Sequence, residues 1–143
     1  DAGLASLRQS SQLAELDLSE NANITDAGLV NLSSITGLTR LNLWRLAISD
    51  AGVSHLAPLV NLRWLNLDNT GLTDKGLAYL TGMQKLQFLH LGSTSVTDAG
   101  LIHLENLSQL NELKVTRTAV TATGITALRE KLPQTTVQLE YLK

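Results

Sequence analysis

The chain has 143 residues, of which 43% are hydrophobic and 17% are charged, and its formal net charge is -2. These values are typical of one globular domain with a continuous core, and they exclude a disordered chain. The charge excludes nucleic-acid binding through phosphate neutralisation, the short apolar runs exclude a membrane-spanning helix, and the absence of cysteine excludes a disulfide framework.

One unit recurs along the whole chain, and residues 62–85, reading LRWLNLDNTGLTDKGLAYLTGMQK, show it best. Its first leucine returns at intervals of 25, 24, 24 and 24 residues. A fixed period of about 20 to 50 residues is the sequence signature of a solenoid. The aligned first leucines are Leu13, Leu38, Leu62, Leu86 and Leu110.

These units predict a single solenoid domain over residues 1–143. It divides into a half repeat at 1–12, repeats at 13–37, 38–61, 62–85, 86–109 and 110–133, and a terminal strand at 134–143. The chain opens within a repeat, so we expect it to be part of a longer protein. The apolar ends of a solenoid are exposed unless a polar repeat caps them, and self-association through the ends is therefore a second expectation.

Each repeat begins with a predicted strand. Numbered from the first leucine, positions 4 and 6 are apolar and position 5 is polar, which is typical of a short strand with one buried face. Position 9 is small and polar in most repeats, and such a side chain can hydrogen-bond the backbone as the chain turns inward. Leu46 is the exception at this position. The polar members are Asn21, Thr70, Thr94 and Thr118.

A predicted helix follows in each repeat. Position 12 is Thr or Ser, which suits a helix N-cap, and an Asp follows in four repeats, where the helix dipole favours an anion. A glycine recurs two residues after that Asp position, and we expect it to let helix and strand backbones approach closely. The three columns are Thr25, Ser49, Thr73, Thr97 and Thr121; Asp26, Asp50, Asp74 and Asp98; and Gly28, Gly52, Gly76, Gly100 and Gly124.

The pattern LxxLxLxxT followed by (I/L/V)(T/S)DxGLxxL resembles the leucine-rich repeat family. Its TDxGL segment is similar to the cysteine-containing subtype of F-box proteins and to related bacterial repeats, although Thr or Asn stands here where that subtype often has Cys. The resemblance implies a right-handed α/β horseshoe, with a parallel sheet on the concave face and short helices on the convex face. It also implies protein binding, usually through the concave face.

The strongest candidate binding residues are aromatic. If positions 4 and 6 point inward, positions 3, 5 and 7 point outward, and three of the five aromatic residues of the chain fall there. Exposed Trp beside Arg is typical of a binding hot spot. Alternatively, Trp64 and Phe88 simply stack, because they share a column in strands about 4.8 Å apart. The predicted anchors are Trp44, Trp64 and Phe88, surrounded by Arg40, Arg45, Asp68 and His90.

No motif indicates catalysis, a cofactor or a metal. Ser19, Asp68 and His90 all point outward, but nothing in their order or spacing defines a triad. His55 and His103 are two repeats apart, too far to share a metal ion whose ligand bonds are about 2.0–2.1 Å long. The Asp column is explained by the helix dipole without calcium.

The sequence therefore predicts a non-catalytic interaction module that binds a protein partner over the concave sheet. The alternative is a structural spacer or self-association module within a multidomain protein. Alanine at Trp44 and Trp64 separates the two, because only the binding module loses affinity while it stays folded.

Overall fold

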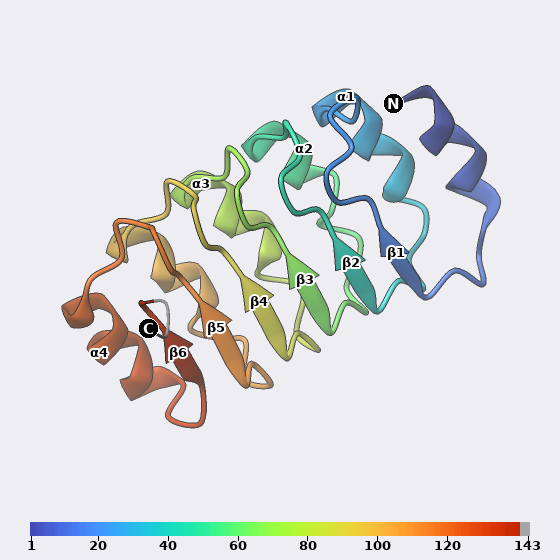
Figure 1. The fold of residues 1–143 in the computed structure, drawn as a ribbon. Helices are drawn as coiled ribbons and strands as arrows, with labels where there is room; N and C mark the ends of the chain where they lie inside the picture. The colour runs from blue at the N-terminus through green and yellow to red at the C-terminus, as the bar shows by residue number, and fades with distance from the viewer. Residues whose placement is uncertain (141–143) are drawn as a thin grey trace.

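The computed structural model describes residues 1–140 and consists of repeated layers, each with one strand and one helical segment (Figure 1). The strands form one open parallel sheet of six strands in the order of the sequence. Each strand is three residues long and covers positions 3 to 5 of its repeat. The strands are β1 (Glu15–Asp17), β2 (Arg40–Asn42), β3 (Trp64–Asn66), β4 (Phe88–His90), β5 (Glu112–Lys114) and β6 (Thr136–Gln138).

The helical segments cover one face of the sheet and leave the other open (Figure 1). Most of them are a single turn of α-helix or a 3₁₀ turn, because each repeat has few residues left after its strand and two loops. Only α4 is a longer α-helix. The segments are η1 (Ala2–Gln9), α1 (Asp26–Leu29), η2 (Val30–Leu32), α2 (Asp50–Ser54), α3 (Asp74–Leu77), η3 (Ala78–Leu80), η4 (Asp98–Leu104) and α4 (Ala122–Lys131).

This architecture confirms the predicted α/β leucine-rich repeat solenoid. The terminal strand is shorter than predicted, since β6 covers only Thr136–Gln138 of the expected 134–143. The last three residues of that prediction, 141–143, lie outside the described residues.

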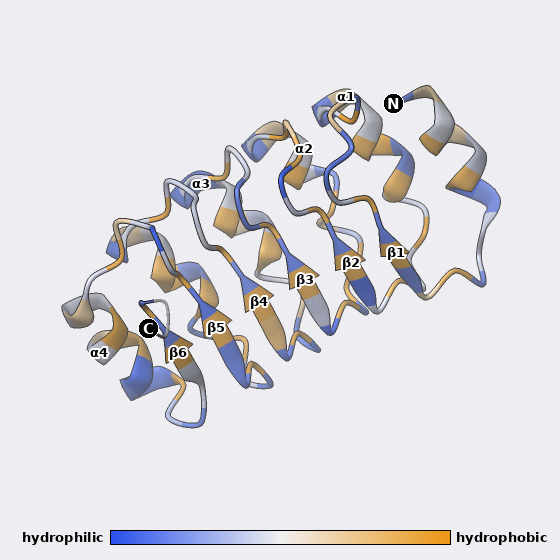
Figure 2. Cartoon of the chain, in the orientation of Figure 1, coloured by the Kyte–Doolittle hydropathy of each residue, from blue (hydrophilic) through white to orange (hydrophobic). Residues whose placement is uncertain are grey.

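The core between sheet and helices is aliphatic. The leucines at position 4 of β2, β3, β4 and β5 face one another in register and have no exposed surface. In Figure 2 the centres of these strands are hydrophobic, and in β2 and β5 the strand residues on either side are hydrophilic. The four leucines are Leu41, Leu65, Leu89 and Leu113.

The polar residues at position 9 hydrogen-bond the backbone, as predicted. Each side chain donates to the carbonyl oxygen three residues before it, at 2.6–2.9 Å. Leu46, which cannot do so, is buried in the core instead, with 3% of its surface exposed. Position 9 therefore fixes the turn that leads the chain from the sheet toward the helical side.

Position 8 carries a feature that the sequence pattern did not reveal. In five repeats its backbone lies in the left-handed region, with φ between 52° and 61°. Only Asn69 belongs to a residue type that enters this region readily, so the other four carry a conformational cost. The side chain at position 8 therefore projects from the turn after the strand, not from the strand itself. The residues are Glu20, Arg45, Asn69, Ser93 and Arg117.

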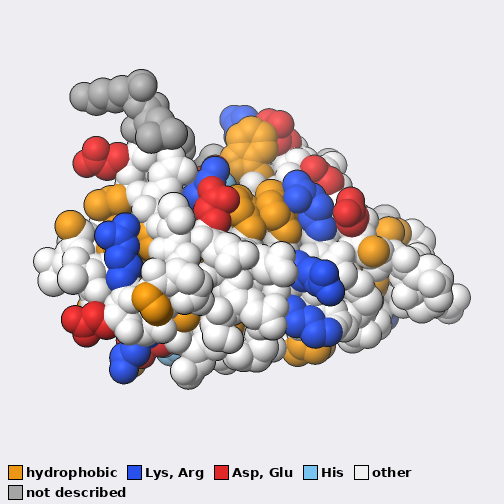
Figure 3. Space-filling view, turned by 90° about the horizontal axis from the view of Figure 1, so that it is seen from below, with side chains coloured by type: hydrophobic (Ala, Val, Ile, Leu, Met, Phe, Trp, Pro, Cys, Tyr) orange, Lys and Arg blue, Asp and Glu red, His pale blue; other side chains and the backbone are white. Residues whose placement is uncertain are grey.

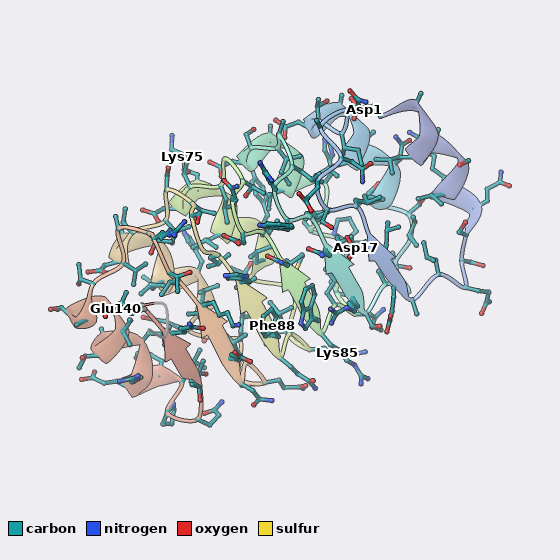
Figure 4. The ribbon with its side chains drawn as sticks, viewed as in Figure 1. Asp1, Asp17, Lys75, Lys85, Phe88 and Glu140 are labelled. Carbon is teal, nitrogen blue, oxygen red and sulfur yellow. The ribbon has the colours of Figure 1, made fainter. Side chains whose placement is uncertain are left out.

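Aspartates clamp each repeat to the next. Asp26 Oδ1 accepts a hydrogen bond from the backbone N–H of Ser49 at 2.7 Å, and its Oδ2 accepts one from the Ser49 hydroxyl at 2.6 Å. The same pair of bonds joins Asp1 to Thr25, and Figure 4 shows Asp1 at this edge, beside α1. It recurs in the pairs Asp50–Thr73, Asp74–Thr97 and Asp98–Thr121.

The same hydroxyls act as the predicted N-caps. Ser49, Thr73, Thr97 and Thr121 each accept a hydrogen bond from a backbone N–H of the first helical turn at 3.2–3.3 Å. Thr25 makes no such side-chain bond. The hydroxyl at position 12 thus both caps its own helix and holds the aspartate of the preceding repeat.

The glycine column was predicted to let helix and strand backbones approach closely, and this prediction was wrong about the group that approaches the glycines. A Cβ at Gly52 would lie inside 3.0 Å of Asp26 Oδ1, a separation that real Cβ atoms do not show. The crowding atom is thus the clamping carboxylate of the preceding repeat, not the backbone of a strand. Gly28, Gly76, Gly100 and Gly124 meet Asp1, Asp50, Asp74 and Asp98 in the same way.

The clamp predicts a dependence of stability on pH. The hydrogen bonds from Thr121 lower the pKa of Asp98 below its ordinary value of 3.8. Because the folded-state pKa lies below the unfolded one, this contribution is complete above about pH 4 and is lost as the pH falls through the folded-state value. Urea unfolding between pH 5 and pH 2 should show a smaller acid loss in Asp98→Asn than in the wild type. Equal slopes would contradict a role for the Asp98 charge.

Candidate functional site

The open face of the sheet, defined as positions 3, 5 and 7 of each repeat, holds six of the seven predicted binding residues, and Arg45 at position 8 borders it. Strand register places the position 3 side chains in one row across the sheet. Figure 4 shows Asp17 and Phe88 at this face, whereas Lys75 lies beside α3 on the helical side. In order across the sheet, the row is Glu15, Arg40, Trp64, Phe88, Glu112 and Thr136.

Trp64 and Phe88 stack on each other at the middle of this row. Their ring centroids are 4.9 Å apart and their planes differ by 6°. The Arg40 guanidinium lies 3.6 Å from the Trp64 ring centroid, and the Lys114 ammonium lies 5.5 Å from that of Phe88. Because Arg40 and Lys114 come from the two flanking strands, the ring faces are covered on both sides. The faces of the two rings are therefore occupied by contacts within the chain.

Trp44 stands apart from this stack. Within residues 1–140 its ring belongs to none of the aromatic pairs, and its side chain is half-buried. Its backbone N–H donates to Asn42 Oδ1 at 3.2 Å, which fixes the chain where it leaves β2. Of the three predicted anchors, Trp44 is the one whose ring has no aromatic or cationic neighbour in the described part of the chain.

Arg45 occupies the left-handed turn after Trp44 and pairs with Glu20 at 3.2 Å. The two side chains are 61% and 54% exposed. An ion pair at this exposure contributes about 0–1 kcal/mol to stability. The Arg45 side chain, at the border of the open face, can therefore separate from Glu20 at little cost in stability.

Asp68 and His90 lie close together around Gly92. A Cβ at Gly92 would be 2.9 Å from Asp68 Oδ1, 2.9 Å from His90 Nε2 and 2.8 Å from Thr116 Oγ1. Asp68 Oδ1 and Thr116 Oγ1 are both buried without a hydrogen-bond partner. Leaving such an atom unpaired costs about 1–3 kcal/mol. Sequence reasoning placed Thr116 and Gly92 on the open face but did not single them out.

The surroundings of His90 keep its imidazole neutral near pH 7. Burial, the largest cause, lowers its pKa from the ordinary 6.5, and the Lys114 charge lowers it further. Asp68 and Glu112 act in the opposite direction but do not reverse the shift. Phe88 adds an edge contact, with its centroid 6.4 Å from that of the His90 ring.

The open face is polar around its aromatic side chains. A shallow hollow of about 330 Å³ lies between β1 and β2 and is lined by Glu15, Leu16, Asp17, Arg40 and Asn42. Hydrogen bonds from Ser19 lower the pKa of Asp17, so this hollow carries a carboxylate at neutral pH. Figure 3, which views the molecule from below, shows hydrophobic side chains among Lys, Arg, Asp and Glu side chains on that side, not one continuous apolar patch.

The described part of the chain contains no cluster of three or more His, Cys, Asp or Glu side chains suited to a metal. It also contains no helix long and apolar enough to cross a membrane. Ser19, Asp68 and His90 do not form a triad, because the Ser19 hydroxyl donates to Asp17 at 2.6 Å.

The stacked parallel strands, single-turn helices and repeated turn chemistry define a leucine-rich repeat solenoid. A family model described as leucine rich repeat matches residues 9–33 and 82–104. No match was found among curated proteins. Two solved structures agree with the fold, and one is internalin C2 of Listeria monocytogenes, 26% identical with a TM-score of 0.78 over 97% of this chain and 58% of that chain.

The other solved structure is a leucine-rich repeat protein of Leptospira interrogans, 18% identical with a TM-score of 0.60 over 94% of this chain and 39% of that chain. The chain thus spans less than two thirds of the length of either protein. Together these findings support a leucine-rich repeat family and indicate a protein-interaction repeat module, a class that is generally non-catalytic.

Proposed function

We propose that this chain is a non-catalytic module that binds a protein partner over the open face of its sheet. The observation that carries the proposal is the placement of Trp44, Trp64 and Phe88 on that face, in a protein whose core is aliphatic. A fully buried aromatic ring would contribute more to folding than these half-buried ones, so a role outside folding accounts best for this placement. The TDxGL segments further support assignment to the leucine-rich repeat subtype that is similar to the cysteine-containing repeats of F-box proteins and to related bacterial repeats.

The stack determines how a partner makes contact. Since the faces of Trp64 and Phe88 are covered, the partner packs against their edges and against Trp44. Arg40, Arg45, Asp68 and His90 form a border of mixed charge around these anchors. We therefore expect a partner surface with an apolar centre and charges of both signs, not a strongly basic or acidic one.

One observation favours the alternative of a structural spacer. The Trp64–Phe88 pair, flanked by Arg40 and Lys114, is satisfied within the chain and stabilises adjacent strands by itself. In that case the open face needs no partner, and the ends or the helical side would carry any self-association.

Affinity capture from source-cell lysate tests the proposal with three baits. The wild type is compared with Trp44→Ala/Trp64→Ala and with Tyr79→Ala, which removes an aromatic residue that is 43% exposed but outside the open face. Circular dichroism first establishes that all three are equally folded. We expect a protein retained by the wild type and Tyr79→Ala and lost from the double variant. Identical sets from all three baits would favour the spacer.

A further inference from the structure

The hollow between β1 and β2 contains two side chains of opposite charge that do not pair with each other. Glu15 and Arg40 lie opposite one another in the strand register, and both line the hollow. Both side chains are exposed, and within residues 1–140 neither of them forms an ion pair. The hollow therefore separates an acceptor on β1 from a donor on β2.

Contacts on the other side of Arg40 explain why it does not reach Glu15. Its guanidinium lies over the Trp64 ring, 3.6 Å from the ring centroid, and Trp64 in turn stacks on Phe88. A cation in this position is attracted by the negative face of the ring. The ring accepts no N–H hydrogen bond in its plane, so the five N–H donors of the guanidinium remain for an acceptor from outside the chain.

The other two polar side chains of the hollow are already used within the chain. Asp17 accepts hydrogen bonds from the Ser19 backbone N–H at 2.9 Å, from the Ser19 hydroxyl at 2.6 Å and from the Asn42 amide at 3.0 Å. The Asn42 carbonyl accepts a backbone N–H from the turn after β2 at 3.2 Å. Glu15 and Arg40 are thus the two side chains of the hollow whose hydrogen bonds go to solvent.

A partner that covers the hollow displaces this solvent and must replace its hydrogen bonds, because a charge left unpaired in an interface is costly. A carboxylate of the partner would satisfy Arg40 but would face the carboxylates of Glu15 and Asp17. A basic side chain would satisfy Glu15 but would face Arg40. A primary amide is uncharged and carries both an acceptor and donors in one planar group. It is therefore the side-chain group that satisfies both residues.

We propose that this hollow is a subsite for one Asn or Gln side chain of the protein partner. The amide carbonyl accepts from the Arg40 guanidinium, and the amide N–H donates to the Glu15 carboxylate. The volume of about 330 Å³ is at the lower end of the range of about 300–1,000 Å³ for ligand pockets, which suits a single side chain. The inference rests on the proposed binding function of the open face, and it adds a specificity that apolar anchors do not provide.

Selection from a random-peptide library displayed on phage, with the wild-type chain as bait, tests the subsite. We expect the selected peptides to share an Asn or Gln near an apolar residue. In calorimetric titration with one such peptide, Glu15→Met and Arg40→Met should each raise the dissociation constant at least tenfold. Replacing the shared Asn or Gln of the peptide by Leu should have a similar effect in the wild type and little further effect in Arg40→Met.

Arg63→Met is the matched control, because Arg63 is an exposed arginine at position 2, outside the open face. It should bind the peptide like the wild type, and circular dichroism establishes that every variant is folded. A shared Asp or Glu in the selected peptides would mean that Arg40 alone is recognised. A shared Lys or Arg would mean that the carboxylates alone are recognised. Either result overturns the amide subsite.

The Trp44→Ala/Trp64→Ala variant separates failure of the subsite from failure of the proposed function. If the selected peptides lose affinity for this variant but contain no shared amide, the open face is a binding surface and the subsite alone is wrong. If no peptide is selected, or if the peptides bind this variant as tightly as the wild type, both the subsite and the proposed function are overturned.

Discussion

Gly52→Ala is expected to lower the free energy of unfolding by about 3–5 kcal/mol. The new Cβ would crowd Asp26 Oδ1, and it would also lie 3.1 Å from Asp26 Cγ and 3.2 Å from Asp26 Cα. Overpacking of this kind costs about 1–3 kcal/mol. Moving the carboxylate away also breaks its two hydrogen bonds to Ser49, and a hydrogen bond to a charged group contributes about 1.5–3 kcal/mol. Urea unfolding measures the loss.

Gly82→Ala is the matched control, because a Cβ there meets only Val60 Cγ1, at 3.8 Å. It should be neutral or stabilising by up to about 1 kcal/mol, since alanine restricts the unfolded chain more than glycine does. Combining Gly52→Ala with Asp26→Ala closes a double-mutant cycle. We expect the double variant to lose clearly less free energy of unfolding than the two single variants lose together, because each single change removes the same clamp. Additive losses would mean that Asp26 is not what excludes a side chain at Gly52.

The fold could be predicted from the sequence because every repeat of the solenoid follows the same local pattern. Leu65 and Leu67 alternate with polar residues, Thr70 closes the turn and Thr73 caps the helix, and each of these roles depends on residues within a few positions. The 24-residue period then fixes which strands are neighbours. Stacking of Trp64 on Phe88 was foreseen as one alternative for the same reason, since both occupy position 3 of adjacent repeats.

The features that could not be predicted from the sequence depend on the directions in which side chains point from one repeat to the next. The Asp26 column was assigned to the helix dipole, whereas its carboxylates actually span 23 residues to the next cap. The left-handed turn at Arg45 had no signal, because glycine, the usual marker, is absent there. The convergence of Asp68, His90 and Thr116 on Gly92 requires three side chains to tilt toward one residue, and residue spacing does not encode tilt.

Leu65→Ala is the second large effect, with an expected loss of about 2–5 kcal/mol in the free energy of unfolding. Leu65 has no exposed surface and lies at the centre of β3, in register with Leu41 on one side and Leu89 on the other. Truncation removes buried methyl groups and leaves a cavity that the two neighbouring layers cannot close without shifting their own strands. Chemical denaturation followed by circular dichroism measures the loss.

Leu16→Ala in β1 is the position-matched comparison. Leu16 occupies the same repeat position, but it is half-buried and pairs with one neighbouring strand, in register with Leu41. In a solenoid the total stability is about the sum of single-repeat terms and nearest-neighbour interfaces. Leu65→Ala weakens two interfaces and Leu16→Ala weakens one, so the loss at Leu65 should be about twice as large. Equal losses would show that stability is held within each repeat and not at the contacts between repeats.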